Sequence, residues 1–242
     1  MSPGSLLSFG ARDGKTVVLA ARGELPLILQ RPVRGPGNQA VVTLLTPAGA
    51  LFDGDSVRLD VCCESGTDVT LTTAAATKLN RGSIEVSMHV RVAAGATFRY
   101  LPHELIPFER AQFAQRIEVD MQTDANVTLL EVIGPGASNA RFTYTSLEFA
   151  TTLRVTGELA VRERFVLTPE SVRQLGGYSH YGSLLHVGGA PPPTALAGFS
   201  GVSRLPREGW VVKTLGSSAQ TVRASLLAAL PSSSGLLPLL PP

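Results

Sequence analysis

Hydrophobic and polar residues alternate one by one along much of the first two-thirds of the chain. Residues 57–61 and 84–92 show this most clearly, with Val, Leu, Ile or Met at every second position and charged or polar residues between them. Since successive side chains of a strand point to opposite faces, the alternation predicts strands with one buried face. Two further sets are Phe113, Ile117, Val119 and Met121, and Leu153, Val155, Leu159, Val161, Phe165 and Leu167, the latter predicting a hairpin that turns at Gly157.

Turn-forming residues separate these runs. About ten to fifteen residues lie between many of the turns, which is typical of layered all-β folds. No sequence repeat of fixed period is evident, but the rhythm is regular enough to be compatible with a solenoid-like stack of strands. The turns are Asp53-Gly54, Ser65-Gly66, Ala94-Gly95, Gly134-Pro135-Gly136 and Thr156-Gly157.

Two short helices interrupt the strands. The first is predicted near residues 168–176, where Thr168 can serve as an N-cap, Pro169 follows at the first helical position, and Gly176-Gly177 ends the helix.

The second helix is predicted near residues 218–230. Ser218 is its expected N-cap and Pro231 its end, and three residues spaced by four form an apolar stripe. These are Val222, Leu226 and Leu230.

The rest of the C-terminal third contains little regular pattern. Residues 188–206, with three consecutive prolines, predict a long loop, and residues 231–242 are expected to form a flexible low-complexity tail. With no convincing internal linker, residues 1–230 are expected to form a single β-rich domain.

Composition excludes several functions. Hydrophobic residues make up 44% and aromatic residues 6%, and the net charge is +2, with Lys and Arg scattered along the chain. Without a basic stripe interleaved with aromatic residues, we expect no nucleic-acid partner. No segment approaches the ~20 apolar residues of a membrane span and no signal peptide is evident, so we expect no membrane association and a cytoplasmic location.

Two cysteines stand next to each other. Cys62 and Cys63 should point to opposite faces of a strand, so they cannot easily hold one metal ion together. Two small buried free thiols are the favoured interpretation, and a vicinal disulfide is the alternative.

Signatures of catalysis are largely missing. Gly177-Tyr178-Ser179-His180 begins like a nucleophile elbow, but Tyr181 stands where the second glycine belongs. An elbow also requires a strand before it and a helix after it, whereas a helix is predicted before this segment. A hydrolase that uses Ser179 and His180 is therefore disfavoured.

A His-Glu pair offers one candidate metal site. His103 and Glu104 could present an imidazole and a carboxylate to a divalent ion such as Ni²⁺ or Zn²⁺. The alternative, which the residues alone favour, is that Glu104 hydrogen-bonds to backbone at a turn between Pro102 and Pro107. Another histidine, His89, is predicted on the solvated face of a strand.

The segment LTTAAATKLNRG, residues 71–82, combines small residues with hydroxyls and two cations. If a strand ends here, the alanines at 74–76 allow another backbone or a partner surface to approach closely, and threonine hydroxyls can satisfy backbone groups. The alternative is a plain strand-to-turn corner. The polar residues are Thr72, Thr73, Thr77, Lys78 and Arg81.

The order of these segments resembles the UreD (UreH) family of urease accessory proteins. GALFDGDSVRLDV, LTTAAATKLNRG, YLPHELIPFERAQF and LLEVIGPGAS follow one another, and GVSRLPREGWVVKTLG precedes the last helix, as in that family. The family has a Gly-Asp pair, a TTQAATK-type segment and a Leu-Pro-x-Glu-x-Ile-x-Phe segment. The matching residues are Gly54, Asp55, Thr72, Thr73, Ala75, Ala76, Thr77, Lys78, Leu101, Pro102, Glu104, Ile106 and Phe108.

Four residues at three sites depart from the family pattern. Ala74 replaces the usual glutamine, Thr46 stands where a histidine is common, and Phe52-Asp53 replaces residues that are usually smaller and uncharged. If the family's histidine contributes to metal binding, that contribution is absent at position 46 of this chain.

The resemblance implies an elongated, β-helix-like stack of strands and a non-enzymatic chaperone. It also implies binding to UreF, which recruits the GTPase UreG, docking on apo-urease, and passage of nickel through the interior. Weak, sequential ligands suit such transit, so no permanently bound cofactor is expected, only transient Ni²⁺. The residues expected on the nickel route are Asp55, His103 and Glu104, and those expected to face partners are Thr72, Thr73, Thr77 and Lys78.

A second hypothesis, from the strand and turn rhythm, is a β-rich module that binds carbohydrate or peptide. It requires an exposed aromatic platform, and the low aromatic content, with Trp210 as the only tryptophan, weighs against it.

Overall fold

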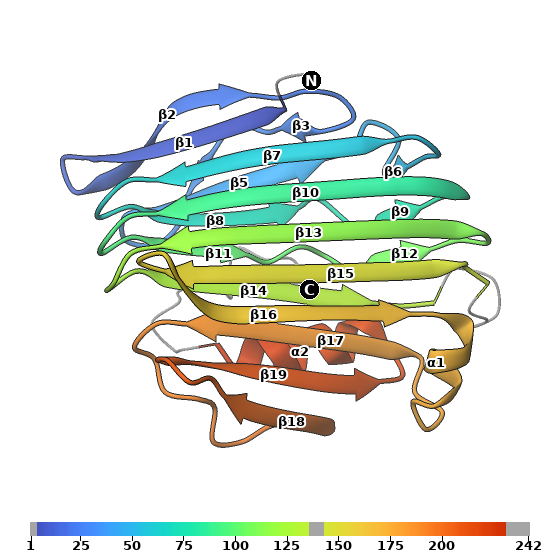
Figure 1. Cartoon of the computed structure of the whole chain (residues 1–242). Coiled ribbons are helices and arrows are strands. Elements are labelled where there is room, and N and C mark those ends of the chain that lie inside the picture. The colour runs from blue at the N-terminus through green and yellow to red at the C-terminus, as the bar shows by residue number, and fades with distance from the viewer. Residues whose placement is uncertain (1–3, 136–142, 231–242) are drawn as a thin grey trace.

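Two β-sheets stacked face to face make up most of the molecule (Figure 1). The computed structural model describes residues 4–135 and 143–230. In spatial order, one sheet contains seven strands: β16 (Glu158–Leu167), β15 (Ser146–Val155), β13 (Ala111–Met121), β10 (Gly82–Val92), β7 (Ser56–Cys63), β1 (Ser5–Arg12) and β2 (Lys15–Arg22).

The other sheet contains twelve strands, several of them short. Its main path is β18 (Phe199–Arg204), β19 (Gly209–Gly216), β17 (His180–Val187), β14 (Asn126–Ile133), β11 (Thr97–Tyr100), β8 (Asp68–Thr73), β5 (Gln39–Leu45) and β3 (Ile28–Leu29). The strands off this path are β4 (Val33–Arg34), β6 (Ala50–Leu51), β9 (Thr77–Leu79) and β12 (Leu105–Pro107). The predicted β-dominated stack is confirmed.

The chain winds between the two sheets like the coils of a solenoid. β5, β8, β11 and β14 are parallel neighbours in one sheet, and β7, β10, β13 and β15 are parallel neighbours in the other. Gln39 lies opposite Asp68, Asp68 opposite Thr97, and Thr97 opposite Asn126, so each partner lies 29 residues farther along the chain. A structural repeat therefore underlies this region, although the residue identities do not make it evident.

The turns between coils share one backbone conformation. Gly66, Gly95 and Asp124 occupy the same place in successive coils and have φ angles of 74°, 70° and 66°. Gly37, which precedes β5 at the same spacing, has φ 65°. Glycine adopts this left-handed conformation freely, and aspartate is among the few other residues that tolerate it. Each coil therefore closes on a residue suited to a tight left-handed turn.

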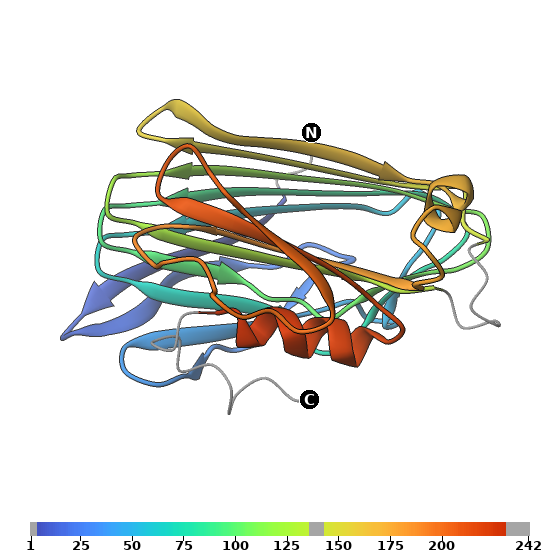
Figure 2. The same cartoon turned by 90° about the horizontal axis from the view of Figure 1, so that it is seen from below.

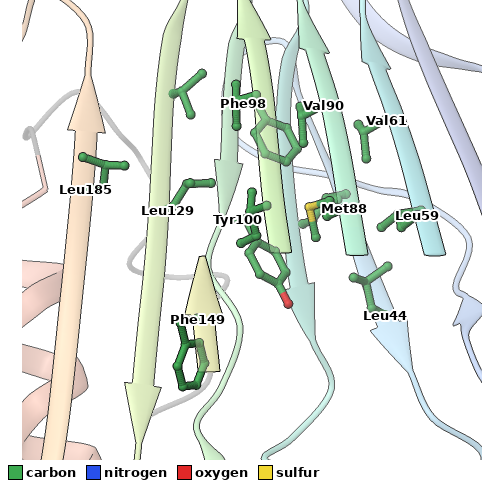
Figure 3. Close-up of a cluster of buried hydrophobic side chains, with 14 of the residues drawn as sticks. Leu44, Leu59, Val61, Met88, Val90, Phe98, Tyr100, Leu129, Phe149 and Leu185 are labelled. Carbon is green, nitrogen blue, oxygen red and sulfur yellow. The ribbon is translucent and has the colours of Figure 1, made fainter. Parts of the chain in front are cut away.

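The main core lies between the inward faces of the two sheets (Figure 3). Alternate residues of each strand point inward, as the sequence predicts, and burying each large apolar side chain contributes about 1.5–3 kcal/mol. Buried residues from both sheets include Leu44, Leu59, Val61, Met88, Val90, Phe98, Leu129, Phe149 and Leu185.

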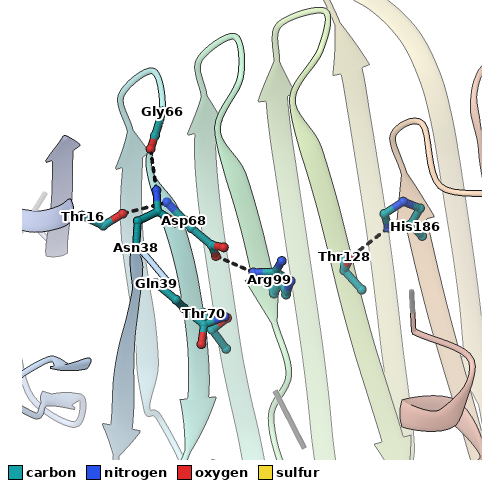
Figure 4. Close-up of polar contacts among 9 residues, drawn as sticks. All are labelled: Thr16, Asn38, Gln39, Gly66, Asp68, Thr70, Arg99, Thr128 and His186. Atoms are coloured by element: carbon teal, nitrogen blue, oxygen red, sulfur yellow. Dashed lines mark hydrogen bonds and ion pairs between the residues drawn. The ribbon is translucent and has the colours of Figure 1, made fainter. Parts of the chain in front are cut away.

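Polar side chains bond one another across strands on the outer face of the twelve-stranded sheet (Figure 4). Arg99 forms a 2.5 Å ion pair with Asp68, and Thr128 Oγ1 lies 3.0 Å from His186 Nδ1. Burial and the Arg99 charge lower the pKa of His186 to about 4. Cross-strand partners satisfy groups that would otherwise be unfavourable to bury. Gln39 and Thr70 form a third pair.

Both predicted helices are present. α1 (Pro169–Arg173) is shorter than predicted and begins at a capping box in which Thr168 and Ser171 bond each other's backbone. α2 (Ala219–Ala228) is capped by Ser218 and lies against the outer face of the twelve-stranded sheet (Figure 2). Its buried residues form a second core with that sheet: Val222, Leu226 and Ala229 pack with Leu101, Leu130, Val132, Leu184, Trp210 and Val212.

The prediction of a loop over residues 188–206 is wrong for its second half, because Phe199–Arg204 form the edge strand β18. Its side chains are mostly exposed on both faces, so no alternation marks it. The tail at 231–242 and part of the Gly134-Pro135-Gly136 turn lie outside the described residues.

Two smaller expectations need correction. Cys62 and Cys63 are both free thiols, but only Cys63 is buried, since Cys62 points to the outer face. His89 is not simply solvated: its ring nitrogens lie 3.0 Å from Asp120 and 3.7 Å from Asp60 on neighbouring strands.

Candidate functional site

A carboxylate and an amide point into the otherwise apolar space between the sheets. Glu131 shares the inward face of β14 with Val127 and Leu129, so strand geometry places its side chain in the interior. Gln115 occupies the matching face of β13, and its Nε2 donates to Glu131 Oε1 at 2.5 Å. The two sheets are thus joined by a polar contact within the core.

An ion pair lies near this carboxylate, where the interior meets one edge of the stack. It joins Glu163 of β16 to Lys213 of β19, strands of opposite sheets. The side chains are 26% and 45% exposed, so the pair faces solvent. A surface groove at this edge is lined by both residues and by Val161, Leu185, Leu205 and Val211.

Burial dominates the electrostatics of Glu131. It raises the pKa of this carboxyl to about 7, and the negative charge of Glu163 adds to the rise. Lys213 and the hydrogen bond from Gln115 act in the opposite direction. Glu131 is therefore protonated in a substantial fraction of molecules near neutral pH, and such a shifted carboxyl is typical of functional sites.

The buried Tyr100 and the half-buried Tyr181 add phenol oxygens to this region. Burial, followed by the charge of Glu131, raises the pKa of Tyr100. Burial also raises the pKa of Tyr181, with Glu163 and Glu131 contributing. Both phenols consequently remain neutral and are available to donate or accept hydrogen bonds.

A cavity of about 110 Å³ adjoins this cluster at Gln115 and Tyr100. Its lining also includes Ala74 and Ala75, which are exposed on the surface. Thr46 lines it as well. Two of the positions that depart from the family pattern, Ala74 and Thr46, therefore lie on this cavity.

The arrangement suits the passage of a cation better than its retention. Carboxylate, amide and phenol oxygens are weak to moderate ligands for divalent ions, and a partly protonated carboxyl can exchange its proton for a cation. Among residues 4–135 and 143–230, no group of three or more His, Cys, Asp or Glu residues is placed to hold a metal ion.

The threonines of the 71–82 segment hold the strand end in place. Thr72 Oγ1 donates to the carbonyl of Leu101 at 2.8 Å, and Thr73 Oγ1 accepts the backbone N–H of His103 at 2.9 Å. Thr77 bonds through its backbone N–H to the carbonyl of Glu104. Lys78 is exposed.

The expected nickel-route residues lie at two separate corners. Asp55 sits in the turn between β6 and β7, where its carboxylate accepts the backbone N–H of Phe52 at 2.7 Å. His103 and Glu104 lie together between β11 and β12, and both are half-buried. Asp53, one of the departures, accepts the backbone N–H of Ser83 and so has a structural role.

Ser179 and His180 are hydrogen-bonded to each other, with Oγ 2.8 Å from Nδ1. His180 is the first residue of β17, and the turn after α1 precedes Ser179, the reverse of a nucleophile elbow.

Glu131 and Gln115 were not singled out from the sequence. The available signal was a glutamate at an inward position of the apolar run LLEVI, and a glutamine at an inward position of FAQRI. The pairing of the two residues across the core required the three-dimensional arrangement.

Comparison with known proteins gives a consistent result. A family model described as "UreD urease accessory protein" matches residues 4–236. A urease accessory protein UreD of Chromohalobacter salexigens is 34% identical over 193 residues, covering 73% of this chain and 62% of that protein. A urease accessory protein UreD 2 of Streptomyces griseus subsp. griseus is 32% identical over 237 residues, covering 85% and 80%.

Other relatives match over a shorter part of their length. A urease accessory protein UreD of Kocuria rhizophila is 33% identical over 156 residues, which cover 62% of this chain and 43% of that protein. The chain thus spans about half the length of some of the curated relatives it matches.

Proposed function

The chain belongs to the UreD family of urease accessory proteins, and we propose that it is a non-enzymatic scaffold in urease maturation. In this role it binds UreF, and through UreF the GTPase UreG, and it docks on apo-urease in the cytoplasm. The match of the family model across residues 4–236 is the observation that carries the proposal.

The interior polar cluster supports a route for nickel. Ni²⁺ is the cargo, and it enters or leaves through the cavity at Ala74 and Ala75, passes Gln115 and Glu131, and reaches the Glu163–Lys213 edge. Each stage offers few donors, so the ion is not trapped. The protein keeps no resident cofactor in this scheme.

Asp55, His103 and Glu104 remain proposed contacts of the ion outside this interior route, and Thr72, Thr73, Thr77 and Lys78 remain proposed contacts of partner proteins. In support of the second group, Ala74 and Ala75 next to them are exposed and leave room for a close approach.

Exposed apolar side chains at both ends of the stack support a bridging role. Leu25 is 72% exposed and Val33 55% exposed at the end formed by the N-terminal strands. Phe199 is 63% exposed on β18 at the other end. Exposed apolar groups of this kind commonly mark protein interfaces, and two opposite ends can hold two partners.

No observation favours the carbohydrate- or peptide-binding alternative. Trp210 is completely buried, and the exposed aromatic side chains of the described residues, Phe52 and Phe199, belong to different parts of the fold. They do not form the platform that this hypothesis requires.

Complex formation tests the scaffold role. When the full chain is mixed with UreF at micromolar concentration, we expect the two to co-elute in gel filtration, and UreG to join only when UreF is present. Absence of a complex under these conditions would contradict the proposal.

Substitutions at the two ends test the bridging arrangement. We expect Leu25→Asp and Phe199→Asp each to weaken the binding of a different partner, UreF or apo-urease, by tenfold or more, because each introduces a charge into one apolar contact. Arg204→Met, an exposed change on the same strand as Phe199, is the matched control. If both aspartate variants bind both partners normally, the ends are not the interfaces.

A further inference from the structure

A second polar cluster lies outside the sheet interior, where α2 meets the connection between β11 and β12. Leu101 packs with Val222 and Leu226 in the outer core. This contact brings the residues that follow Leu101, among them His103, beside the second turn of the helix, which carries Arg223.

His180 approaches the same place from β17. A Cβ atom built on Gly134 would lie 2.9 Å from His180 Nε2, so the imidazole rests directly on this glycine. The N–H of Gly134 in turn donates to the carbonyl of Leu105 at 3.0 Å, next to Glu104. Three segments far apart in the sequence thus converge here.

Arg223 has no counter-ion in this cluster. Arg223 is only 7% exposed, and its Nε and Nη2 atoms have no hydrogen-bond partner among the described residues. Within the described part of the chain, no ion pair joins it to Glu104 or to any other carboxylate. His103 Nε2 is also buried and has no hydrogen-bond partner in residues 4–135 and 143–230.

A buried guanidinium without a partner is strongly unfavourable in a folded protein. Burial lowers the pKa of Arg223, while the Glu104 carboxylate raises it. The Glu104 carboxylate is therefore close enough to affect the pKa of Arg223, but it forms no ion pair with the guanidinium. The planar donors of Arg223 match oxyanions better than any other ligand class.

We infer that Arg223 and His103 together form a binding site for an oxyanion of the carboxylate or phosphate type. Arg223 provides the charge and two free donors, and His103 Nε2 provides a third polar contact. Glu104 opposes the bound anion and weakens its binding. The oxyanion is either a free small anion or a carboxylate side chain of a bound protein.

Calorimetric titration of the full chain tests the free-anion source. Sodium phosphate and sodium acetate are titrated separately at constant ionic strength, and this arm does not depend on the proposed function. We expect saturable binding at one site, weakened at least tenfold in Arg223→Met and unchanged in Arg204→Met, which alters an exposed arginine.

Glu104→Gln provides an independent readout should Arg223→Met fail to fold. Removal of the opposing charge is expected to tighten phosphate binding about tenfold, as for like charges several ångströms apart near a protein surface. A purely structural role of Glu104 would not tighten binding. Unchanged or weaker binding in Glu104→Gln, or normal binding in a folded Arg223→Met, would overturn the inference.

If the wild-type chain binds neither anion, the same variants are measured for affinity to UreF and to apo-urease. Weaker binding by Arg223→Met together with tighter binding by Glu104→Gln would show that this binding site takes a carboxylate side chain of a partner protein. If neither affinity changes, the inference is wrong for both sources.

Discussion

Glu131 shows most directly how a single residue links fold and function in this protein. Its position on the inward face of β14 places a half-buried carboxylate beside apolar core residues, where it accepts a hydrogen bond from Gln115. Burial of this kind destabilises the ionised form. A residue that weakens the fold at neutral pH is expected where a function needs it.

Glu131→Gln should therefore stabilise the protein in a pH-dependent way. The unfolded chain ionises this carboxyl from about pH 4.5, but the folded chain does so only near pH 7, so wild-type stability falls as pH rises between these values. We expect the variant to be more stable than wild type by up to about 3 kcal/mol at pH 8, and by little at pH 4.5.

Urea denaturation at the two pH values measures this difference. Glu118→Gln, an exposed change on the outer face of β13, is the control and should have no such pH dependence. A gain of equal size at both pH values would show that Glu131 titrates normally.

Several residues behave as the sequence indicates. The hydroxyls of Thr72 and Thr73 satisfy backbone groups, and Asp53-Gly54 forms a turn between β6 and β7. The pairing of Glu131 with Gln115 could not be predicted from the sequence, because the two residues lie in opposite sheets. Local sequence patterns do not indicate which side chains face each other across a core.

The turns between coils are the elements that set the repeat. Gly37, Gly66, Gly95 and Asp124 follow one another at the spacing of the strand register and share positive φ. The repeat is thus visible in the positions of the turn residues. It is not visible in the strands, because any apolar residue can fill an inward-facing position there. This is why the alternation predicts strands but does not reveal their period.

Substitutions at two of these turns should have opposite effects. Gly95→Ala should lower the free energy of unfolding by about 1 kcal/mol, because a left-handed conformation is strained for alanine. A Cβ there would meet no atom within 4 Å, so backbone strain acts alone. Asp124→Gly should be neutral or stabilising by up to about 1 kcal/mol.

Thermal unfolding of both variants provides the measurement. Destabilisation by Asp124→Gly comparable to that of Gly95→Ala would mean that the aspartate side chain, not its backbone angle, determines this turn.

Long alternating strands and both helix caps were predictable at the element scale, since their signals are local. β18 was not, because its side chains are mostly exposed, and the short corner strands β6, β9 and β12 are defined by pairing with neighbouring coils. Such pairing is a long-range property.

At the scale of the whole molecule, stacked coils create an interior that two sheets share. The prediction of a stacked β body is confirmed, but the parallel order of the strands depends on contacts between distant segments. Within the described residues, no helix is of sufficient length and apolar character to cross a membrane. The proposed nickel route runs through this shared interior, from Ala74 to the Glu163–Lys213 edge.

Nickel transfer to urease tests this route most directly. Apo-urease is incubated with Ni²⁺, GTP, UreF, UreG and either the wild-type chain, Glu131→Gln or Glu118→Gln, and urease-bound nickel is measured over time. We predict that Glu131→Gln assembles the complex normally but delivers nickel at least several-fold more slowly, while Glu118→Gln matches wild type. Delivery by Glu131→Gln at the wild-type rate would contradict passage through the interior.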